Sequence, residues 1–295
     1  MRKIIMTVAA VVVCAFALTA CGGDGDDSDS SSASTRADEG IWSYTSTNQI
    51  GDQNVLQTVI LSDGSYWGVY GDYDITGCFQ GSDVLHGTAS VSGNNASGTY
   101  MDFGYVFDSF GSTNTSINGA YAGTVSAQSN FNLTFNDGST TSDMVSLSNI
   151  NMSYDSIYNQ PASLASIAGN YPQALNGCIN SGGPLLLPGQ TPILSASYTL
   201  SISGSNLSLV QSYNGSTNVV MTGTVAPHGT TVNVFDVSLT GTSAAAASNG
   251  PSWSIPVGVT FTGILFQTSG ILKNNIELVA TTADNSSALF YMGTK

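Results

Sequence analysis

Short runs of alternating apolar and polar residues dominate the chain from Gly40 onward. In 131–135, which reads Phe-Asn-Leu-Thr-Phe, the odd positions are apolar and the even positions polar. That period of two is typical of a strand with one buried face. The runs are rich in Thr, Val, Ile and Tyr, and Gly, Asn, Asp and Ser interrupt them, with hairpin signals at Asp63-Gly64 and Asn136-Asp137-Gly138. We therefore predict an all-β protein made of antiparallel sheets.

Two sets of strands follow from this pattern. The first set is predicted at 41–47, 55–61, 65–70, 84–92, 98–103, 117–125, 131–136 and 143–154, and the second at 169–172, 197–203, 206–213, 218–226, 231–240, 257–267, 275–282 and 287–293. Between them, Pro161 suits the first turn of a helix and Gly169 suits its end, so we predict a short helix from Pro161 to Ala168. A Gly/Pro-rich stretch at 181–192 is predicted to be a loop.

The two sets predict two tandem antiparallel β-barrel-like domains of about eight strands each, at 40–159 and 170–295, joined by a linker helix at 160–169. Closure removes the exposed edges that would recruit other chains. A barrel of this size has an interior that side chains can fill or that holds one small ligand. The alternative is a pair of immunoglobulin-like sandwiches; the short up-and-down links favour barrels.

The N-terminus carries an export signal. Arg2 and Lys3 precede an apolar run at 4–18, and Leu18-Thr19-Ala20-Cys21 closes it. The run is short for a membrane span. This arrangement resembles a bacterial lipoprotein signal, which implies cleavage after residue 20, a diacylglycerol on the sulfur of Cys21 and a fatty acyl group such as palmitate on its new amine. The alternative is an ordinary signal peptide with an unlipidated Cys21.

The stretch at 21–39 contains no large apolar side chain. It has nothing to bury, so we predict a lipidated cysteine followed by a disordered acidic tether. In lipoproteins, aspartate directly after the lipidated cysteine favours retention in the inner membrane; here Gly22 occupies that position. The resemblance therefore implies an outer-membrane location, on either the cell surface or the periplasmic face.

The charge balance excludes one class of partner. The formal net charge is −14, with five Lys and Arg against nineteen Asp and Glu, and removal of Arg2 and Lys3 with the signal makes it more negative. Nucleic acid is excluded as a partner because binding it requires basic side chains that neutralise phosphates. The membrane is contacted through the lipid anchor alone.

Two cysteines remain after the signal and the anchor. Cys78 and Cys178 lie in the two predicted domains, each directly after a glycine. Export to an oxidising compartment permits a disulfide between them. The alternative is two separate buried thiols.

Four stretches carry a wider resemblance: Gly40-Ile41-Trp42, 62–70, 87–100 and 222–229. Their strand and turn pattern resembles a group of proteobacterial surface lipoproteins with calycin-like barrels, similar to those of transferrin-binding protein B. The resemblance implies eight-stranded barrels and a binding or host-interaction role. Lipocalins pair their Gly-x-Trp with a late arginine, whereas the late strands here offer only Lys273 and Lys295. This departure argues against a lipocalin pocket.

Signals for catalysis are weak. His86 and His228 fall in different predicted domains, and we interpret both as turn or surface residues. The sequence contains no nucleophile elbow, zinc-protease helix, Cys-x-x-Cys pair or phosphate-binding loop. We therefore predict no catalytic residues, no metal site, no cofactor and no enzymatic activity.

Acidic and aromatic residues are concentrated in the first half. Residues 40–160 hold ten aspartates and no Lys or Arg, together with most of the aromatic residues. Such a set could form a sugar-stacking platform, a cation or amine pocket, or a face for a basic partner. The alternative is that aromatics fill the barrel while aspartates sit in turns and keep the surface soluble. Our candidate ligand-binding cluster is Trp67 with Asp72, Tyr73 and Asp74, because 71–74 has the composition of a loop.

These observations predict a lipid-anchored, non-enzymatic outer-membrane protein that binds a protein, glycan or small-molecule ligand. The alternative is a structural lipoprotein that maintains the envelope without a dedicated ligand.

Overall fold

The structure is a computed structural model. It describes residues 36–47, 51–73, 79–106, 113–136, 149–173, 185–186, 197–213, 215–242, 257–269 and 275–295. Cys21, Asp74, Cys78 and Cys178 lie outside this set. Lipidation of Cys21 and the disulfide therefore stay predictions.

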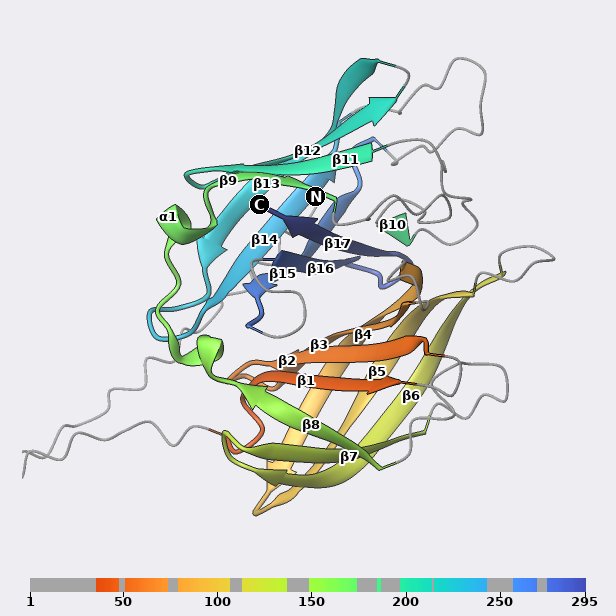
Figure 1. Ribbon diagram of the computed structural model, residues 1–295, viewed down its shortest axis with the longest axis vertical. Helices are drawn as coiled ribbons and strands as arrows, with labels where there is room; N and C mark the ends of the chain where they lie inside the picture. Colours follow the sequence, from red (N-terminus) through yellow and green to blue (C-terminus); the bar gives the residue numbers. More distant parts are fainter. Residues whose placement is uncertain are drawn as a thin grey trace, which may run out of the picture. The chain divides into compact units, whose positions relative to one another are not determined.

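The first sheet is a closed antiparallel barrel of eight strands, β1 to β8 in sequence order, with β8 pairing back to β1 (Figure 1). Its strands are β1 (Gly40–Thr47), β2 (Gln53–Ile60), β3 (Ser65–Tyr73), β4 (Phe79–Ser92), β5 (Asn95–Val106), β6 (Thr113–Ser126), β7 (Asn130–Asn136) and β8 (Ile150–Asp155). The predicted barrel is confirmed, and the sandwich alternative is wrong for this sheet.

Alternating side chains fill the barrel interior. In β7, Phe131, Leu133 and Phe135 are buried in the core while the intervening residues are exposed, as the pattern predicts. The same inward face carries Trp42, whose ring meets Phe131 edge to face at 5.3 Å. The predicted filling of the barrel by aromatic side chains is thus confirmed for these positions.

Two glycines make room for tyrosines inside this barrel. Gly98 pairs with Tyr121, and Tyr100 pairs with Gly119, across β5 and β6. A Cβ on either glycine would overlap the facing tyrosine ring. These glycines, which fall within the predicted strands 98–103 and 117–125, are therefore required by close packing.

Not all the aspartates occupy turns. Asp83 on β4 and Asp102 on β5 are buried, with exposed fractions of 8% and 2%. The expectation that aspartates keep to the turns is wrong for these two residues. By contrast, Asp63 does lie in a tight turn, where it accepts a hydrogen bond from the backbone N–H of Ser65 at 2.8 Å.

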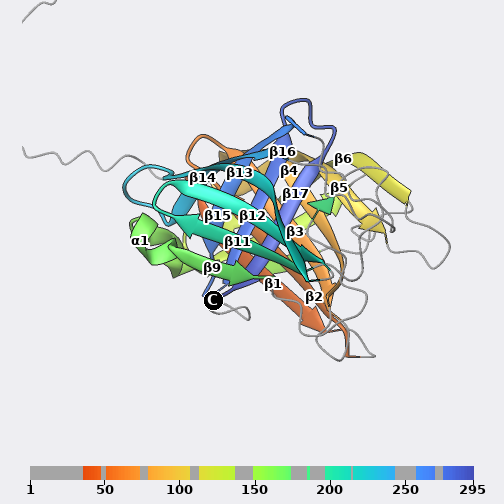
Figure 2. The same cartoon turned by 90° about the horizontal axis from the view of Figure 1, so that it is seen from above.

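The second sheet is antiparallel and has nine strands in the order β10-β17-β16-β15-β14-β13-β12-β11-β9. Its strands are β9 (Gly169–Pro172), β10 (Leu185–Leu186), β11 (Ser197–Ser203), β12 (Asn206–Tyr213), β13 (Ser216–Pro227), β14 (Val234–Gly241), β15 (Thr260–Gln267), β16 (Asn275–Thr282) and β17 (Ala288–Thr294). Figure 2 shows β9, β11 and β12 side by side at one end of this order. The short strand β10 lies within the stretch predicted to be a loop, so that prediction is wrong for these two residues.

The two ends of this sheet curl toward each other into a barrel-like form. A single bridge joins Gln173 to Gly293 of β17. The hydroxyl of Tyr291 donates to the carbonyl oxygen of Tyr171 at 2.6 Å and accepts the N–H of Leu200 at 3.2 Å. One tyrosine therefore substitutes for part of the hydrogen-bond ladder that would close the barrel.

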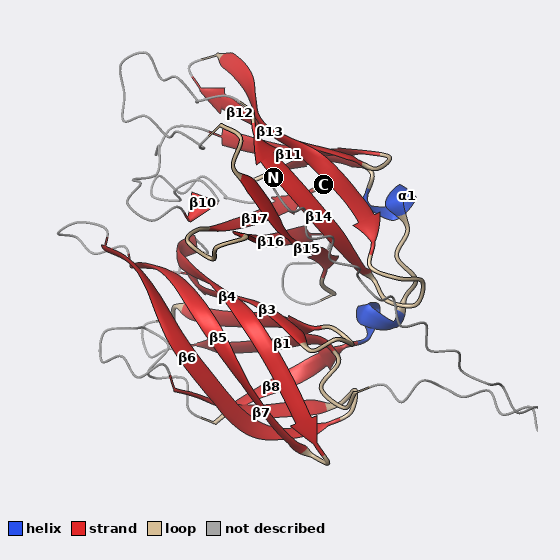
Figure 3. Cartoon of the chain, turned by 180° about the vertical axis from the view of Figure 1, so that it is seen from behind, coloured by secondary structure: helices blue, strands red, loops and turns tan. Residues whose placement is uncertain are grey.

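The link between the two sheets contains less helix than predicted. A 3₁₀ turn, η2 (Ser156–Asn159), is followed by one turn of α-helix, α1 (Leu164–Ile167), and both lie between β8 and β9 in the sequence. Figure 3 shows the two helical segments in blue. Asp155 begins η2 by accepting a hydrogen bond from the N–H of Ile157. The two-turn helix at 161–168 is wrong in length because Pro161 to Ser163 remain extended or irregular.

The tether was expected to reach residue 39, but its last four residues are packed against the first barrel. Arg36 binds Asp38 with two hydrogen bonds, at 3.0 and 2.9 Å, and also donates to the carbonyl oxygen of Ala89. The carbonyl oxygen of Asp38 accepts the indole N–H of Trp42 at 2.8 Å. The side chain of Asp38 is fully buried as a result.

A buried apolar cluster connects the outer face of the first barrel with the second sheet. It includes Val59 and Trp67 from the first and Phe266, Val279 and Phe290 from the second. Polar contacts reinforce it: Asp155 accepts the backbone N–H and the hydroxyl of Ser269, both at 2.6 Å. Both sheets belong to one compact unit, 35–295. The division into two separate domains stays a prediction.

Candidate functional site

A row of directly paired side chains crosses the outer face of the first barrel. Trp67 on β3 pairs with His86 on β4, His86 with Met101 on β5, and Met101 with Asn118 on β6. Because inward positions such as Tyr66 and Tyr100 alternate with these, the row faces away from the barrel interior. The strand pattern alone therefore brings an aromatic, an imidazole, a thioether and an amide into one line.

At the Trp67 end, this row meets a groove between the two sheets, which we call the junction groove. Its volume is about 560 Å³. The lining residues that matter here carry rings, carboxylates or hydroxyls and come from both sheets: Asp63, Trp67, His86, His228, Asp236, Thr281 and Thr282. A groove of this size is in the range of small-molecule sites.

His86 is held as a neutral hydrogen-bond acceptor. Its ring stacks on that of Trp67 with centroids 3.8 Å apart and planes 22° apart. Its Nδ1 lies 3.2 Å from the carbonyl oxygen of Tyr66, which can only accept, so Nδ1 carries the hydrogen. Burial lowers the pKa of His86, although the bond to Tyr66 opposes part of that effect. The ring is therefore uncharged at neutral pH and Nε2 keeps a free lone pair.

His228 is fixed in a similar way from the second sheet. Its Nδ1 lies 2.7 Å from Oδ1 of Asp236, which is 58% exposed. An ionised carboxylate can only accept, so Nδ1 donates and Nε2 is left for another partner. The two histidines that the sequence places in different halves thus line one groove. His228 lies in a bend directly after β13 with its side chain 28% exposed, in agreement with its interpretation as a turn or surface residue. His86 instead lies on β4 and is partly buried.

Asp63 adds a carboxylate to this groove. Partial burial disfavours its charge, but hydrogen bonds from Ser65, with a smaller contribution from His228, outweigh burial and lower the pKa of Asp63 below its usual value. Asp63 is therefore ionised at neutral pH. The described residues that line the groove include no Lys or Arg. The groove presents acceptors to its contents and would repel an anion.

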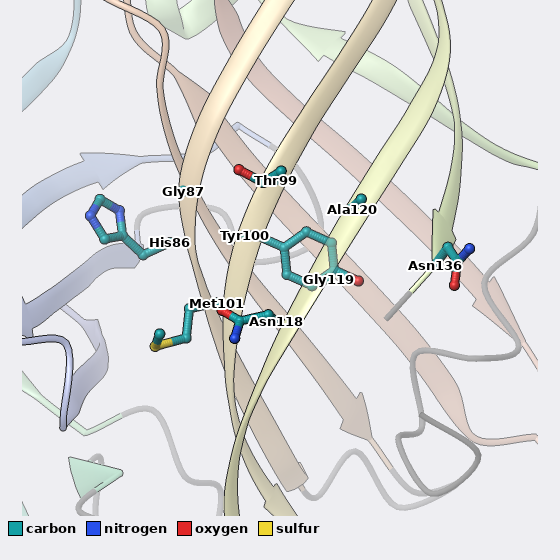
Figure 4. Close-up of a pocket in the computed structure, with 9 residues that line it drawn as sticks. All are labelled: His86, Gly87, Thr99, Tyr100, Met101, Asn118, Gly119, Ala120 and Asn136. Carbon is teal, nitrogen blue, oxygen red and sulfur yellow. The ribbon is translucent and has the colours of Figure 1, made fainter. Parts of the chain in front are cut away.

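A second groove, which we call the outer groove, continues along the barrel surface. It has a volume of about 590 Å³ and is lined from β4 to β7 by His86, Gly87, Thr99, Tyr100, Met101, Asn118, Gly119, Ala120 and Asn136. Figure 4 shows His86 and Met101 projecting to the same side, with Asn118 beside Met101. His86 lines both grooves and so stands where they meet.

The predicted binding cluster is only partly described. Trp67 lines the junction groove, has an exposed fraction of 7%, and stacks its ring against that of His86. Asp72 and Tyr73 belong to β3 and pair with Gly81 and Phe79, so the reading of 71–73 as loop is wrong. Their side chains, like Asp74, lie outside what the structure describes. Binding by these three residues stays a prediction.

Sequence reasoning missed His86 and His228 as groove residues, together with Asp63 and Asp236. Each lies at an ordinary strand or turn position, and the four residues are between 8 and 173 residues apart in the sequence. The sequence offered one sign of this site: Asp236 follows His228 by eight residues, a spacing at which a hairpin can pair them. The other residues of the groove come together only through contacts between distant parts of the chain.

The described residues contain no group of three or more His, Cys, Asp or Glu side chains placed to hold a metal ion. No helix in the same part of the chain is long and apolar enough to cross a membrane.

The chain matches no protein-family model, and a search of curated proteins finds no match.

Proposed function

We propose that this protein is a lipid-anchored, non-enzymatic outer-membrane protein that binds a ligand in the junction groove. The anchor rests on the lipoprotein-like signal that ends at Cys21. The barrel-like sheets are consistent with the calycin-like fold that the sequence resembles. The observation that carries the binding role is the junction groove itself, where His86 and Asp63 of one sheet meet His228 and Asp236 of the other.

The polar groups of this groove favour a ligand rich in donors. Nε2 of His86 and the carboxylates of Asp63 and Asp236 accept hydrogen bonds. The hydroxyl of Thr282, by contrast, is already bonded to Asp284 and to the backbone N–H groups of Ser286 and Ser287. Hydroxyl and ammonium groups supply such donors. Phosphates and carboxylates would meet like charge with no basic side chain nearby among the described residues.

Binding, rather than catalysis, accounts for the way His228 is held. An Asp–His pair acts in nucleophilic catalysis when the second ring nitrogen activates a serine, threonine or cysteine. In the part of the chain that the structure describes, the only hydrogen bond of the His228 ring is to Asp236. The pair therefore orients an imidazole for recognition.

Ligand binding is tested by calorimetry with detergent-solubilised full-length mature protein. The probes are spermidine and the neutral trisaccharides maltotriose, cellotriose and chitotriose. We expect at least one probe to bind, and the double variant Asp63→Asn with His228→Gln to weaken its binding about tenfold or more, because two polar contacts are lost. Asp52→Asn, on the β1–β2 connection outside the groove, is the matched control. Equal affinity of the double variant and the wild type would reject the groove as the site.

Anchoring is tested separately in cells. Labelled palmitate should be incorporated into the wild-type protein but not into Cys21→Ser, which should leave the membrane fraction. Protease treatment of intact cells then distinguishes a surface from a periplasmic location. If a deletion strain has a permeable envelope and the groove double variant restores it fully, the protein acts as a structural lipoprotein instead.

A further inference from the structure

Two parallel rows of outward side chains connect the grooves. The first is the row Trp67, His86, Met101 and Asn118 described above. The second row runs through Ser65, Thr88, Thr99, Ala120 and Asn136, each paired with the next across β3 to β7. Ser65 lines the junction groove, and Thr99, Ala120 and Asn136 line the outer groove. The rows thus run without a break from one groove to the other.

The side chains become more exposed and more polar along these rows. At the junction end the ring of Trp67 is covered and His86 is half-buried; at the other end Thr99 and Asn118 are exposed. The hydroxyls of Thr88 and Thr99 lie 3.3 Å apart, so either can donate to the other or to a ligand. Amide and hydroxyl groups both donate and accept, which suits a partner whose groups also do both.

From this arrangement we propose that the junction groove and the outer groove form one continuous track for a neutral oligosaccharide. The inference rests on the proposed ligand-binding function and names the class of ligand. A sugar chain presents alternating ring faces and hydroxyls, which match the imidazole of His86 and the Thr and Asn side chains beyond it.

Two other classes of extended ligand fit less well. Anionic polymers would meet a chain with a net charge of −14 and, among the described residues of both grooves, no Lys or Arg. An extended peptide binds most readily by adding a strand to a free sheet edge. The first barrel is closed and both rows cross the faces of paired strands, so they offer no such edge.

The geometry also fixes the length of the ligand. Neighbouring strands are about 4.8 Å apart, so the second row, which crosses five strands, spans roughly 19 Å. That is longer than a disaccharide can cover. Binding should therefore tighten as the chain grows and then level off once the track is filled.

The test is calorimetry with full-length mature protein and maltose, cellobiose and chitobiose, each compared with its tetra- and hexasaccharide. We expect one series to bind at least tenfold more tightly at six units than at two. The outer-groove double variant Thr99→Val with Asn118→Ala should reduce hexasaccharide affinity about tenfold and leave disaccharide affinity unchanged, because it removes contacts that only the longer chain reaches.

The matched control is Thr124→Val with Asn132→Ala. These residues pair with each other on β6 and β7, are exposed on the same barrel and line neither groove. The control should bind every length as the wild type does.

The remaining outcomes separate this inference from the proposed function. If disaccharides bind and the junction-groove variant abolishes that binding, yet affinity does not rise with length, the continuous track is wrong while ligand binding stands. If spermidine binds and no saccharide does, the oligosaccharide track is likewise wrong while ligand binding stands. If no probe binds at all, both proposals fail.

Discussion

Glu277 provides the sharpest test of the buried contact between the two sheets. It lies on β16 between Ile276 and Leu278, which face the interior of the second sheet, so its own side chain points to the opposite face. The side chain is 0% exposed, and neither carboxylate oxygen has a hydrogen-bond partner among the described residues. Gln57 of the first barrel is close, but its amide donates to Thr268 at 3.4 Å.

Burial raises the pKa of Glu277 from 4.5 to about 8, against a smaller opposing effect of Gln57. Below pH 4.5 the group is protonated in both the folded and the unfolded chain. As pH rises from there toward 8, the unfolded chain loses the proton while the folded protein keeps it, so the free energy of unfolding falls. At about 1.4 kcal/mol per pKa unit, the loss reaches about 5 kcal/mol above pH 8. That is a large share of the stability of an ordinary domain.

The variant Glu277→Gln removes this titration with little change of shape. We expect it to match the wild type at pH 5 within about 1 kcal/mol, because both side chains are then neutral. At pH 9 it should be the more stable protein by up to about 5 kcal/mol. Urea unfolding at pH 5, 7 and 9, followed by tryptophan fluorescence, measures the difference.

Asp284→Asn is the control for general effects of carboxylate removal. Bonds from Thr282 and Ser286 lower the pKa of Asp284 to about 2, so its stabilising effect is lost only as pH falls through the acid range. Its substitution should therefore change stability by the same amount at pH 5 and pH 9. If Glu277→Gln and the wild type show the same pH dependence between 5 and 9, Glu277 is ionised in the folded protein and the reasoning is refuted.

Three further substitutions test other parts of the fold by chemical unfolding. Arg36→Met should lower the free energy of unfolding by about 3 kcal/mol, because it leaves the buried carboxylate of Asp38 without its bidentate partner. A decrease under about 0.5 kcal/mol would contradict this. Asp155→Ala should cost about 3 kcal/mol through the two bonds to Ser269 that join the sheets, and Asp155→Asn should recover part of it. Gly119→Ala should cost about 1–3 kcal/mol because the new methyl overlaps a tyrosine ring, and a neutral result would show that the ring can move.

The sequence predicted the fold class because local patterns carry it. Alternation in β7, the Asp63-Gly64 turn and the short links are properties of neighbouring residues, and they agree with the structure. Errors occurred where local preference was weak or was outweighed. Gly71 to Tyr73 belong to β3 because β4 provides a partner strand. The helix predicted at 161–168 is reduced to one turn, in which only Ile167 is buried.

The strands β2 and β16 are buried on both faces, although polar residues interrupt their apolar ones. A strand with one buried face alternates, whereas Val55 to Ile60 and Ile276 to Thr282 are buried at every position. Their outer faces are covered by the other sheet, which buries Gln57 and Glu277 at positions where the polar residue types predict exposure.

The candidate site belongs to the tertiary structure. The sequence by itself determined an acidic, nearly lysine-free β protein with two barrel-like sheets, and it proposed Trp67 as a candidate contact. Only the packing of one sheet on the other placed His86 and His228 in the same groove and buried Glu277, while strand pairing within each sheet fixed the tautomers of the two histidines. Those relations depend on residues far apart in the chain, and strand periodicity records which face a side chain takes, not which residue lies opposite it.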